Sequence, residues 1–330
     1  MTATKKLSVI IPMFNVADCV ARAARSIAVQ QSDKLEIVLV DDGSVDDSLQ
    51  VCMENLYCTD VVVIKQPNKG LSGARNAGIW ASSGEYVLFL DADDFLLPNA
   101  IVNICTLLES SQPDVLFGRY LRWSPEGGFY KSKPYNYQPP NDPTLHVEYI
   151  LDALPEPSWN AWRYVCRRRF LIEYDLFFEQ GLFCEDIPWT LALLNKASSI
   201  EFLQEPFYAY FHRRPQSILF SMNTKRFIDL NHSVSVLLRE YANQPAICRQ
   251  LVWQSFLYIN EYCQFGRDDR KLLLDSYRMV LPLYTHSTVK LHHIAGKCSN
   301  QILMYLMSIV LFLIKHVRST WMRIMERNLC

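Results

Sequence analysis

The chain has 330 residues, half of them hydrophobic, and a formal net charge of -1 at pH 7. That length suffices for one large domain, or a domain with an appendage, around a sizeable apolar core. The near-neutral charge excludes a general electrostatic attraction to nucleic acid, so we expect no nucleic-acid partner. The ten cysteines form no Cys-x-x-Cys pair. This pattern favours scattered thiols in a reducing compartment, without disulfides or a zinc site.

Strand and helix patterns alternate along the first part of the chain. Apolar and β-branched runs predict strands at residues 7–11, 35–40, 61–64, 86–90 and 115–117. Helical periodicity predicts helices at 16–31, from a cap at Ser44 or Asp46 to about residue 56, within 68–82 and at 99–110. Such alternation predicts an α/β fold with a doubly wound, mostly parallel, Rossmann-like sheet, whose ligand crevice lies at the carboxyl ends of the strands.

Two of these strands end in carboxylates. Residues 91–94 read Asp-Ala-Asp-Asp after one strand, and residues 41–44 read Asp-Asp-Gly-Ser after another. Both turns therefore fall on the same edge of the predicted sheet. Oxygen ligands at this density suit Mg²⁺ or Mn²⁺, although a solvated acidic turn before the next helix is the alternative. The glycine-rich residues 70–78 match neither the dinucleotide fingerprint nor a P-loop.

Five segments of the sequence, taken together, suggest a family. They are residues 8–15, 40–44, 68–78, 90–94 and 185–186. In this order and spacing they resemble the family 2 glycosyltransferases of GT-A fold, over residues 7–220. The segments at 159–160 and 213–218 also look like those of bacterial members that build capsule, exopolysaccharide or lipopolysaccharide sugars. The resemblance implies transfer of a sugar from a nucleotide donor, usually UDP, to a bacterial surface glycan such as lipopolysaccharide core or O-antigen.

The resemblance also implies which residues bind the nucleotide sugar. Pro12 and its turn, which includes Asn15, line the nucleotide pocket. Asp42 accepts a hydrogen bond from the base, or Asp41 takes that role. Arg75 makes a structural or phosphate-side contact, with an ion pair on the helix surface as an equal alternative.

Metal binding and catalysis are implied at the remaining carboxylates. Asp93 is the direct ligand of Mn²⁺ or Mg²⁺, Asp91 faces the ribose or a metal-bound water, and Asp94 is an alternative ligand. Asp186 matches the general base, with Glu185 as its neighbour or substitute; a helix N-terminus is the alternative for this pair. A single displacement would invert the anomeric centre. Because Asp42, Asp91, Asp93 and Asp186 are all present, a catalytically inactive nucleotide-sugar-binding scaffold is the less favoured alternative.

Aromatic and basic side chains gather between residues 158 and 197. Trp159, Trp162 and Trp189 could stack on acceptor sugars, although such residues more often belong to a core. The run Arg167–Arg169 is typical of a solvated face, and could also meet acceptor phosphates. Before this region, residues 121–144 are rich in Pro, Gly, Asn and Tyr, which predicts a long irregular excursion.

Helical periodicity takes over near residue 220, so we expect a catalytic domain at 1–220 and a helical region at 221–330. Residues 302–314 are mostly apolar but too few to span a membrane, and basic residues follow them. This pattern predicts a segment at 297–330 that lies on an anionic membrane surface, with a packed core helix as the alternative. The protein would then be cytoplasmic and peripheral on the inner membrane, near a glycan or lipid-linked glycan acceptor.

Overall fold

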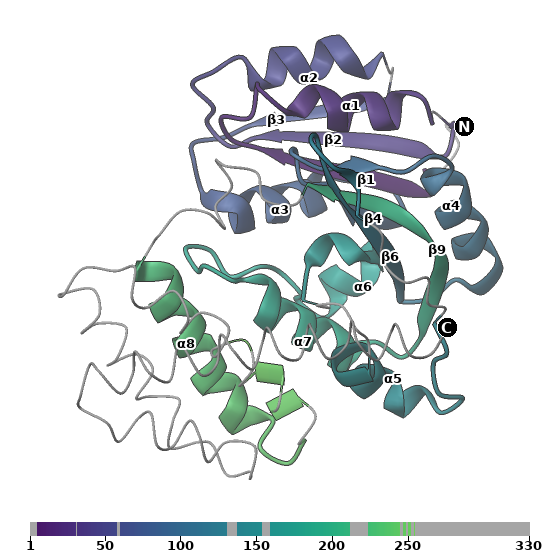
Figure 1. Cartoon of the computed structure of the whole chain (residues 1–330), viewed down its shortest axis with the longest axis vertical. Helices are drawn as coiled ribbons and strands as arrows, with labels where there is room; N and C mark the ends of the chain where they lie inside the picture. Colours follow the sequence, from purple (N-terminus) through teal and green to yellow (C-terminus); the bar gives the residue numbers. More distant parts are fainter. Residues whose placement is uncertain are drawn as a thin grey trace. The chain divides into compact units, whose positions relative to one another are not determined.

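The computed structural model describes residues 5–30, 32–57, 60–130, 137–153, 159–211 and 224–244, together with 247–248, 250–251 and 254. The chain divides into two compact units, Met1–Phe220 and Ser221–Cys330. A nine-stranded sheet forms the centre of the first unit, in the order β3-β2-β1-β4-β8-β6-β9-β5, with β7 paired to β6 (Figure 1). The strands are β1 (Leu7–Met13), β2 (Leu35–Asp41), β3 (Val61–Lys65), β4 (Tyr86–Phe89), β5 (Phe95–Leu96), β6 (Val115–Ser124), β7 (Gly128–Phe129), β8 (Tyr164–Arg167) and β9 (Ile200–Phe211).

The four strands β3, β2, β1 and β4 are parallel to their neighbours. Their carboxyl ends therefore share one edge, and the predicted doubly wound α/β arrangement is confirmed. Strand β8 then enters the sheet antiparallel to both β4 and β6, which the sequence did not predict. Strands β6 and β9 run parallel to each other across a register shift near Arg119.

Helices cover both faces of the sheet. Helices α1 (Val20–Ala28) and α2 (Ser48–Leu56) lie on one face and α3 (Gly70–Ala81) on the other (Figure 1). The alternation of side chains in β1 explains this arrangement, because Val9 packs in the same core as α1 while Ile10 faces α3. A Cβ on Gly78 of α3 would lie 2.3 Å from Ile10 Cγ2, so only glycine allows this close packing.

The other helices of the first unit complete the layers around the sheet. They are α4 (Ala100–Ser111), α5 (His146–Glu148), α6 (Arg168–Glu173) and α7 (Asp186–Lys196), with a 3-10 turn at Ala161–Arg163. Helix α4 packs its apolar side into the core that α1 also enters. Helix α7 begins with the predicted catalytic pair at its amino end, because Glu185 is the N-cap residue and Asp186 the first helical residue.

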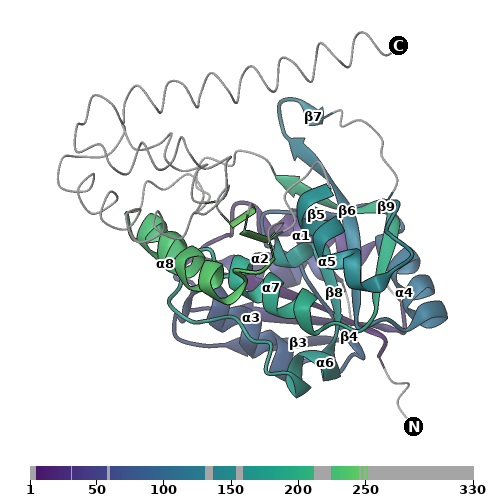
Figure 2. The same ribbon diagram turned by 90° about the horizontal axis from the view of Figure 1, so that it is seen from below.

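Two predicted boundaries were wrong. Helix α1 begins at Val20 rather than residue 16, and Val16 and Ala17 before it donate their N–H groups to Ser48 Oγ and Asp46 Oδ2 of the neighbouring loop. Residues 121–124, expected to be irregular, extend β6, since pairing with β9 continues to Trp123 and Phe211. The β6–β7 hairpin then projects beyond the rest of the sheet (Figure 2).

The second unit contains α8 (Thr224–Glu240), in the region where helices were predicted. Residues 213–218 and the predicted membrane-surface segment at 297–330 lie outside the described residues. Within the part of the chain that the structure describes, no helix is both long and apolar enough to cross a bilayer.

Candidate functional site

The loops that follow β1 and β2 hold the residues predicted to bind the nucleotide. Asp42 is buried, and its Oδ1 accepts hydrogen bonds from Gln66 Nε2 at 2.7 Å and from the Lys69 N–H at 2.9 Å. Asp41 is half-buried and accepts from the Ser44 N–H. Of the two, Asp42 has its carboxylate more fully satisfied within the protein, and Asp41 is the more accessible.

The remaining two residues of this group differ in accessibility. Pro12 is buried within β1, opposite Val40 of β2. Asn15 is exposed with a positive φ of 52°, and its Oδ1 accepts the Val45 N–H at 2.9 Å. The hydrogen bonds of Asn15 with Ser44 and Val45 tie the loops after β1 and β2 together at this edge of the sheet.

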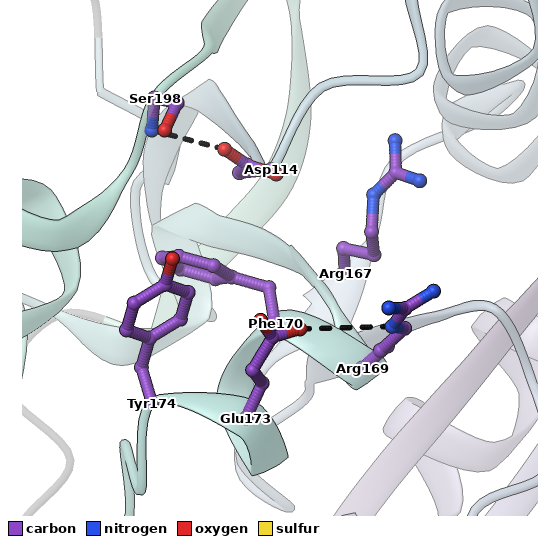
Figure 3. A pocket seen from close by; sticks show the side chains of 7 residues that line it. All are labelled: Asp114, Arg167, Arg169, Phe170, Glu173, Tyr174 and Ser198. Atoms are coloured by element: carbon purple, nitrogen blue, oxygen red, sulfur yellow. Dashed lines mark hydrogen bonds and ion pairs between the residues drawn. The ribbon is translucent and has the colours of Figure 1, made fainter.

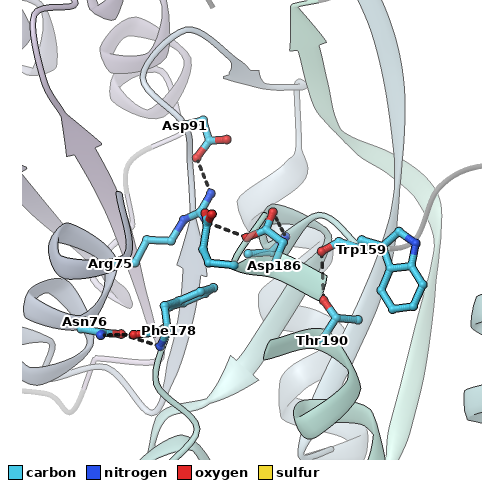
Figure 4. A network of polar contacts seen from close by, with 9 residues as sticks. Arg75, Asn76, Asp91, Trp159, Phe178, Asp186 and Thr190 are labelled. Carbon is cyan, nitrogen blue, oxygen red and sulfur yellow. Dashed lines mark hydrogen bonds and ion pairs between the residues drawn. The ribbon is translucent and has the colours of Figure 1, made fainter. Parts of the chain in front are cut away.

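Arg75 lies at the centre of a cluster of three carboxylates (Figure 4). Its Nη2 contacts Asp91 Oδ1 at 3.1 Å, and its Nη1 contacts Glu185 Oε1 at 2.9 Å and Asp186 Oδ1 at 2.7 Å. The Arg75 side chain is only 1% exposed, so the alternative of an ion pair on the helix surface was wrong. One guanidinium thus joins the end of β4 to the start of α7.

The charges in this cluster alter one another's proton affinity. Burial would lower the pKa of Arg75, but the carboxylates of Asp186, Asp91 and Glu185 raise it above its ordinary value, so the guanidinium stays charged. Burial, followed by the neighbouring Asp186 carboxylate, raises the pKa of Glu185 to about 7. Burial also raises the pKa of Asp186 while Arg75 opposes it. Both carboxyl groups therefore hold a proton more readily than in water.

Two further contacts orient the segment that carries the acidic pair. Asn76, next to Arg75 on α3, exchanges two hydrogen bonds with the backbone of Phe178, at 2.8 and 2.9 Å (Figure 4). Asp186 Oδ2 accepts the Ala161 N–H at 3.2 Å. Because each carboxylate oxygen has more than one lone pair, Asp186 keeps acceptor capacity beyond these bonds.

The three carboxylates of the acidic turn have different surroundings. Asp94 is 1% exposed, and its side chain accepts hydrogen bonds from Tyr208 Oη and the Phe211 N–H, both at 2.7 Å. Burial, and then the charges of Asp93 and Asp91, raise its pKa well above the ordinary value. Asp91 and Asp93 are both half-buried. Tyr208 also accepts the Asp91 N–H at 3.1 Å, so β9 holds both ends of the turn.

The carboxylates of the acidic turn differ in whether they could bind a divalent cation. The described residues contain no group of three or more His, Cys, Asp or Glu side chains arranged to hold a metal ion. Asp91, whose Oδ1 contacts Arg75, and Asp93 are the half-buried carboxylates that would make up a donor set, whereas Asp94 is directed at β9. Mg²⁺ is commonly bound by one or two carboxylates together with substrate phosphates, so the donor set fits an ion that arrives with a diphosphate.

The predicted aromatic and basic residues lie mostly in the interior. Trp159, Trp162 and Trp189 are all nearly buried, as expected for core residues. The run Arg167–Arg169 is not uniformly solvated, because its first two members donate to the carbonyls of Gln112, Pro113, Ile79 and Trp80. Arg169, which is exposed, and Arg167 line a small pocket with Asp114 and Glu173 (Figure 3). Its two acidic side chains offset the two arginines.

The sequence analysis missed two contributors to the site. Tyr208 binds both ends of the acidic turn, and Gln66 binds Asp42. The alternation of aromatic residues at 207–211 indicates a strand, but nothing in it indicates which ring would reach the turn. Gln66 lies two residues after the strand predicted at 61–64, at the edge where the site was expected, and this position was the available signal.

Comparisons with known proteins agree with this geometry. Residues 8–161 match the family described as Glycosyl transferase family 2. The chain is 27% identical over 303 residues to the uncharacterized glycosyltransferase YibD of Escherichia coli (strain K12), covering 88% of this chain and 87% of YibD. It is 31% identical over 229 residues to the uncharacterized glycosyltransferase EpsJ of Bacillus subtilis (strain 168), covering 64% of this chain and 62% of EpsJ.

A solved structure shows the same fold. Residues 1–349 of TarS from S. aureus, in complex with UDP-GlcNAc, superpose with a TM-score of 0.67 at 19% identity, over 85% of this chain and 82% of that one. The fold of this protein is therefore GT-A. The family match over residues 8–161 and this fold both agree with the resemblance to the family 2 glycosyltransferases.

Proposed function

We propose that this protein is an inverting, metal-dependent glycosyltransferase that uses a UDP-sugar and a bacterial surface glycan. The observation that carries the proposal is the sharing of Arg75 by Asp91, on the donor side, and Asp186, the proposed base. A transferase must hold the leaving diphosphate and deprotonate the attacking hydroxyl at one place. The TarS complex with UDP-GlcNAc supports a UDP donor for this fold.

The proposed reaction is a single displacement. The acceptor hydroxyl oxygen attacks the anomeric carbon, the bond from that carbon to the diphosphate breaks, and Asp186 takes the hydroxyl proton. A Mn²⁺ or Mg²⁺ ion held by Asp93 and Asp91 would neutralise the charge on the departing diphosphate. Asp42 or Asp41 would accept a hydrogen bond from the base, with Pro12 and Asn15 beside it. Attack from the opposite face inverts the anomeric configuration.

Asp94 takes a structural role in this scheme. Its carboxylate is buried and hydrogen-bonded to Tyr208 and the Phe211 N–H, so it shapes the turn without reaching the ion. Glu185 shares Arg75 with Asp186, and the Asp186 carboxylate helps to raise the pKa of Glu185. We assign catalysis to Asp186 because its position between Arg75 and the Ala161 N–H holds the carboxylate in one orientation.

The acceptor belongs to the bacterial surface, as lipopolysaccharide core or O-antigen, capsule or exopolysaccharide. Attachment of residues 297–330 to an anionic cytoplasmic leaflet would bring the enzyme to a lipid-linked acceptor.

Calorimetry of UDP with and without Mn²⁺, followed by a screen of labelled UDP-sugars with surface-glycan acceptors, tests the proposal. Metal-dependent UDP binding and transfer with inverted configuration are expected. Metal-dependent binding with no transfer to any acceptor or water would instead favour an inactive nucleotide-sugar-binding scaffold.

A further inference from the structure

One face of helix α1 carries a row of polar side chains that binds the segment containing the acidic turn. Arg22 and Ser26 are four residues apart on α1, and Gln30 follows at the same spacing in the turn just after the helix ends, so the three side chains lie on one side. Most of the remaining inward positions of α1, such as Val20 and Ile27, are apolar and belong to the core. Polar side chains beside an apolar core need hydrogen-bond partners, and these three find them in one segment.

The row meets the backbone of residues 93–101 in order. Arg22 Nη2 donates to the Asp93 carbonyl at 2.7 Å, and Ser26 Oγ accepts the Leu96 N–H at 3.0 Å. Gln30 Nε2 donates to the Leu97 carbonyl at 3.0 Å, while its Oε1 accepts the Ile101 N–H at 3.2 Å. Arg22, Ser26 and Gln30 thus fix successively later points of the segment that starts at the acidic turn.

Aromatic rings hold the Arg22 end of this row in place. The guanidinium carbon lies 4.4 Å from the centre of the Trp123 ring, 4.7 Å from that of Phe211 and 5.5 Å from that of Phe95. Phe95 and Phe211 each pack edge-on against Trp123. A flat guanidinium enclosed in this way loses little further freedom when it donates to a carbonyl. Its position is therefore well defined.

We propose that Arg22 is a positioning residue for the diphosphate and metal site, acting through the main chain of Asp93. This inference rests on the proposed function, in which Asp93 binds the ion. Two elements hold the turn, since Arg22 fixes its backbone from α1 while Asp94 is held by β9. The Arg22 hydrogen bond is made to the Asp93 backbone carbonyl, so Arg22 acts on the position of this residue through its main chain.

The test is the Mn²⁺-dependent part of UDP affinity, measured by calorimetry on the full chain. Arg22→Met removes the donor and the cation but keeps an unbranched side chain among the rings. We expect the gain in UDP affinity on adding Mn²⁺ to fall by about tenfold, the lower end for a hydrogen bond from a charged donor. UDP affinity without metal should stay within about twofold, because Asp42 and its partners are untouched.

Arg25→Met is the matched control. It lies on the same helix and is exposed, and it donates to Asn55 rather than to the acidic turn. This variant should bind UDP as the wild type does, with and without Mn²⁺. If Arg22→Met does not fold by circular dichroism, Ser26→Ala tests the same row, with an expected loss of about threefold in the metal-dependent gain.

The outcomes separate this inference from the proposed function. A wild-type protein without Mn²⁺-dependent UDP binding refutes the proposed function and this role with it. A wild-type protein that shows the metal-dependent gain, beside a folded Arg22→Met variant that keeps the full gain, refutes the positioning role alone. Equal losses with and without metal would show a general disturbance of the fold and would also overturn it.

Discussion

Replacing Arg75 with methionine should destabilise the protein strongly. The guanidinium is 1% exposed, and its three partners, Asp91, Glu185 and Asp186, have side chains 25%, 12% and 20% exposed. Removing one partner of a buried ion pair costs about 3–5 kcal/mol, because the remaining charge is left uncompensated. Partial access of water to the carboxylates favours the lower end. We therefore expect the free energy of unfolding to fall by about 3 kcal/mol.

The loss should depend on pH. Without Arg75, mutual repulsion and burial raise the pKa values of Glu185 and Asp186 further, so the folded state binds protons more tightly than the unfolded state. A carboxyl whose pKa is raised in the folded state destabilises that state progressively as the pH rises above the unfolded-state pKa, and fully once the pH exceeds the folded-state pKa. The difference from the wild type should therefore be larger at pH about 8 than at about 5.5.

Urea denaturation followed by tryptophan fluorescence measures this difference. Arg169→Met is the control, because it removes the same charge from a side chain that is 88% exposed, and it should change stability by less than about 0.5 kcal/mol. Arg75→Lys should recover only part of the loss, since an ammonium cannot reproduce the fork that meets three carboxylates. An Arg75→Met protein within about 1 kcal/mol of the wild type at both pH values would refute the reasoning.

The remaining predictions concern the reaction and the membrane. Asp186→Asn should keep UDP affinity but lower transfer by about two to four orders of magnitude, and near-normal turnover would exclude it as the base. Because burial raises the pKa of Asp186, the proposed base, kcat/KM should fall as the pH drops through that raised pKa, and the residual rate of Asp186→Asn should lack this limb. By calorimetry, Asp93→Ala should abolish Mn²⁺-dependent UDP binding, whereas Asp94→Ala should mainly lower the melting temperature; the reverse pattern would exchange their roles. Truncation after Gly296 should move the protein from the membrane fraction to the supernatant without loss of UDP binding. Full-length protein that does not bind anionic vesicles would refute this prediction.

The parallel half of the sheet could be predicted because each of its strands is marked by the residues of the strand itself and of the turn after it. Each strand there is a short apolar run that ends in turn residues, and the alternation with helices determines the edge at which Asp42 and Asp91 lie. The antiparallel entry of β8 could not be predicted in this way. Its neighbours β4 and β6 lie far away in the sequence, and a four-residue strand is too short for its sequence to indicate which strands it pairs with.

The different surroundings of the carboxylates within residues 91–94 also could not be predicted from the sequence. Asp93 and Asp94 are adjacent and chemically identical, so pattern alone leaves either as a ligand. Tyr208, 114 residues after Asp94, distinguishes them by donating a hydrogen bond to Asp94 in the interior. For Arg75 the sequence showed a charge on a helix. It did not show that Gly78 lets that helix lie against β1, with its arginine facing the strand ends.

Helix α3 explains why a site built from distant segments can act as a unit. At the N-cap of α3, the Lys69 N–H donates to Asp42, one of the two residues proposed to bind the nucleobase. Arg75 then joins Asp91 to Asp186, and Asn76 holds the backbone of Phe178, which leads to α7. One rigid helix thus contacts the nucleotide end, the diphosphate end and the proposed catalytic base. Each of these hydrogen bonds fixes one segment of the proposed site to α3. In the proposed reaction, the distance between the nucleotide sugar and the catalytic base Asp186 would therefore depend on α3 more than on the long loops before Asp186.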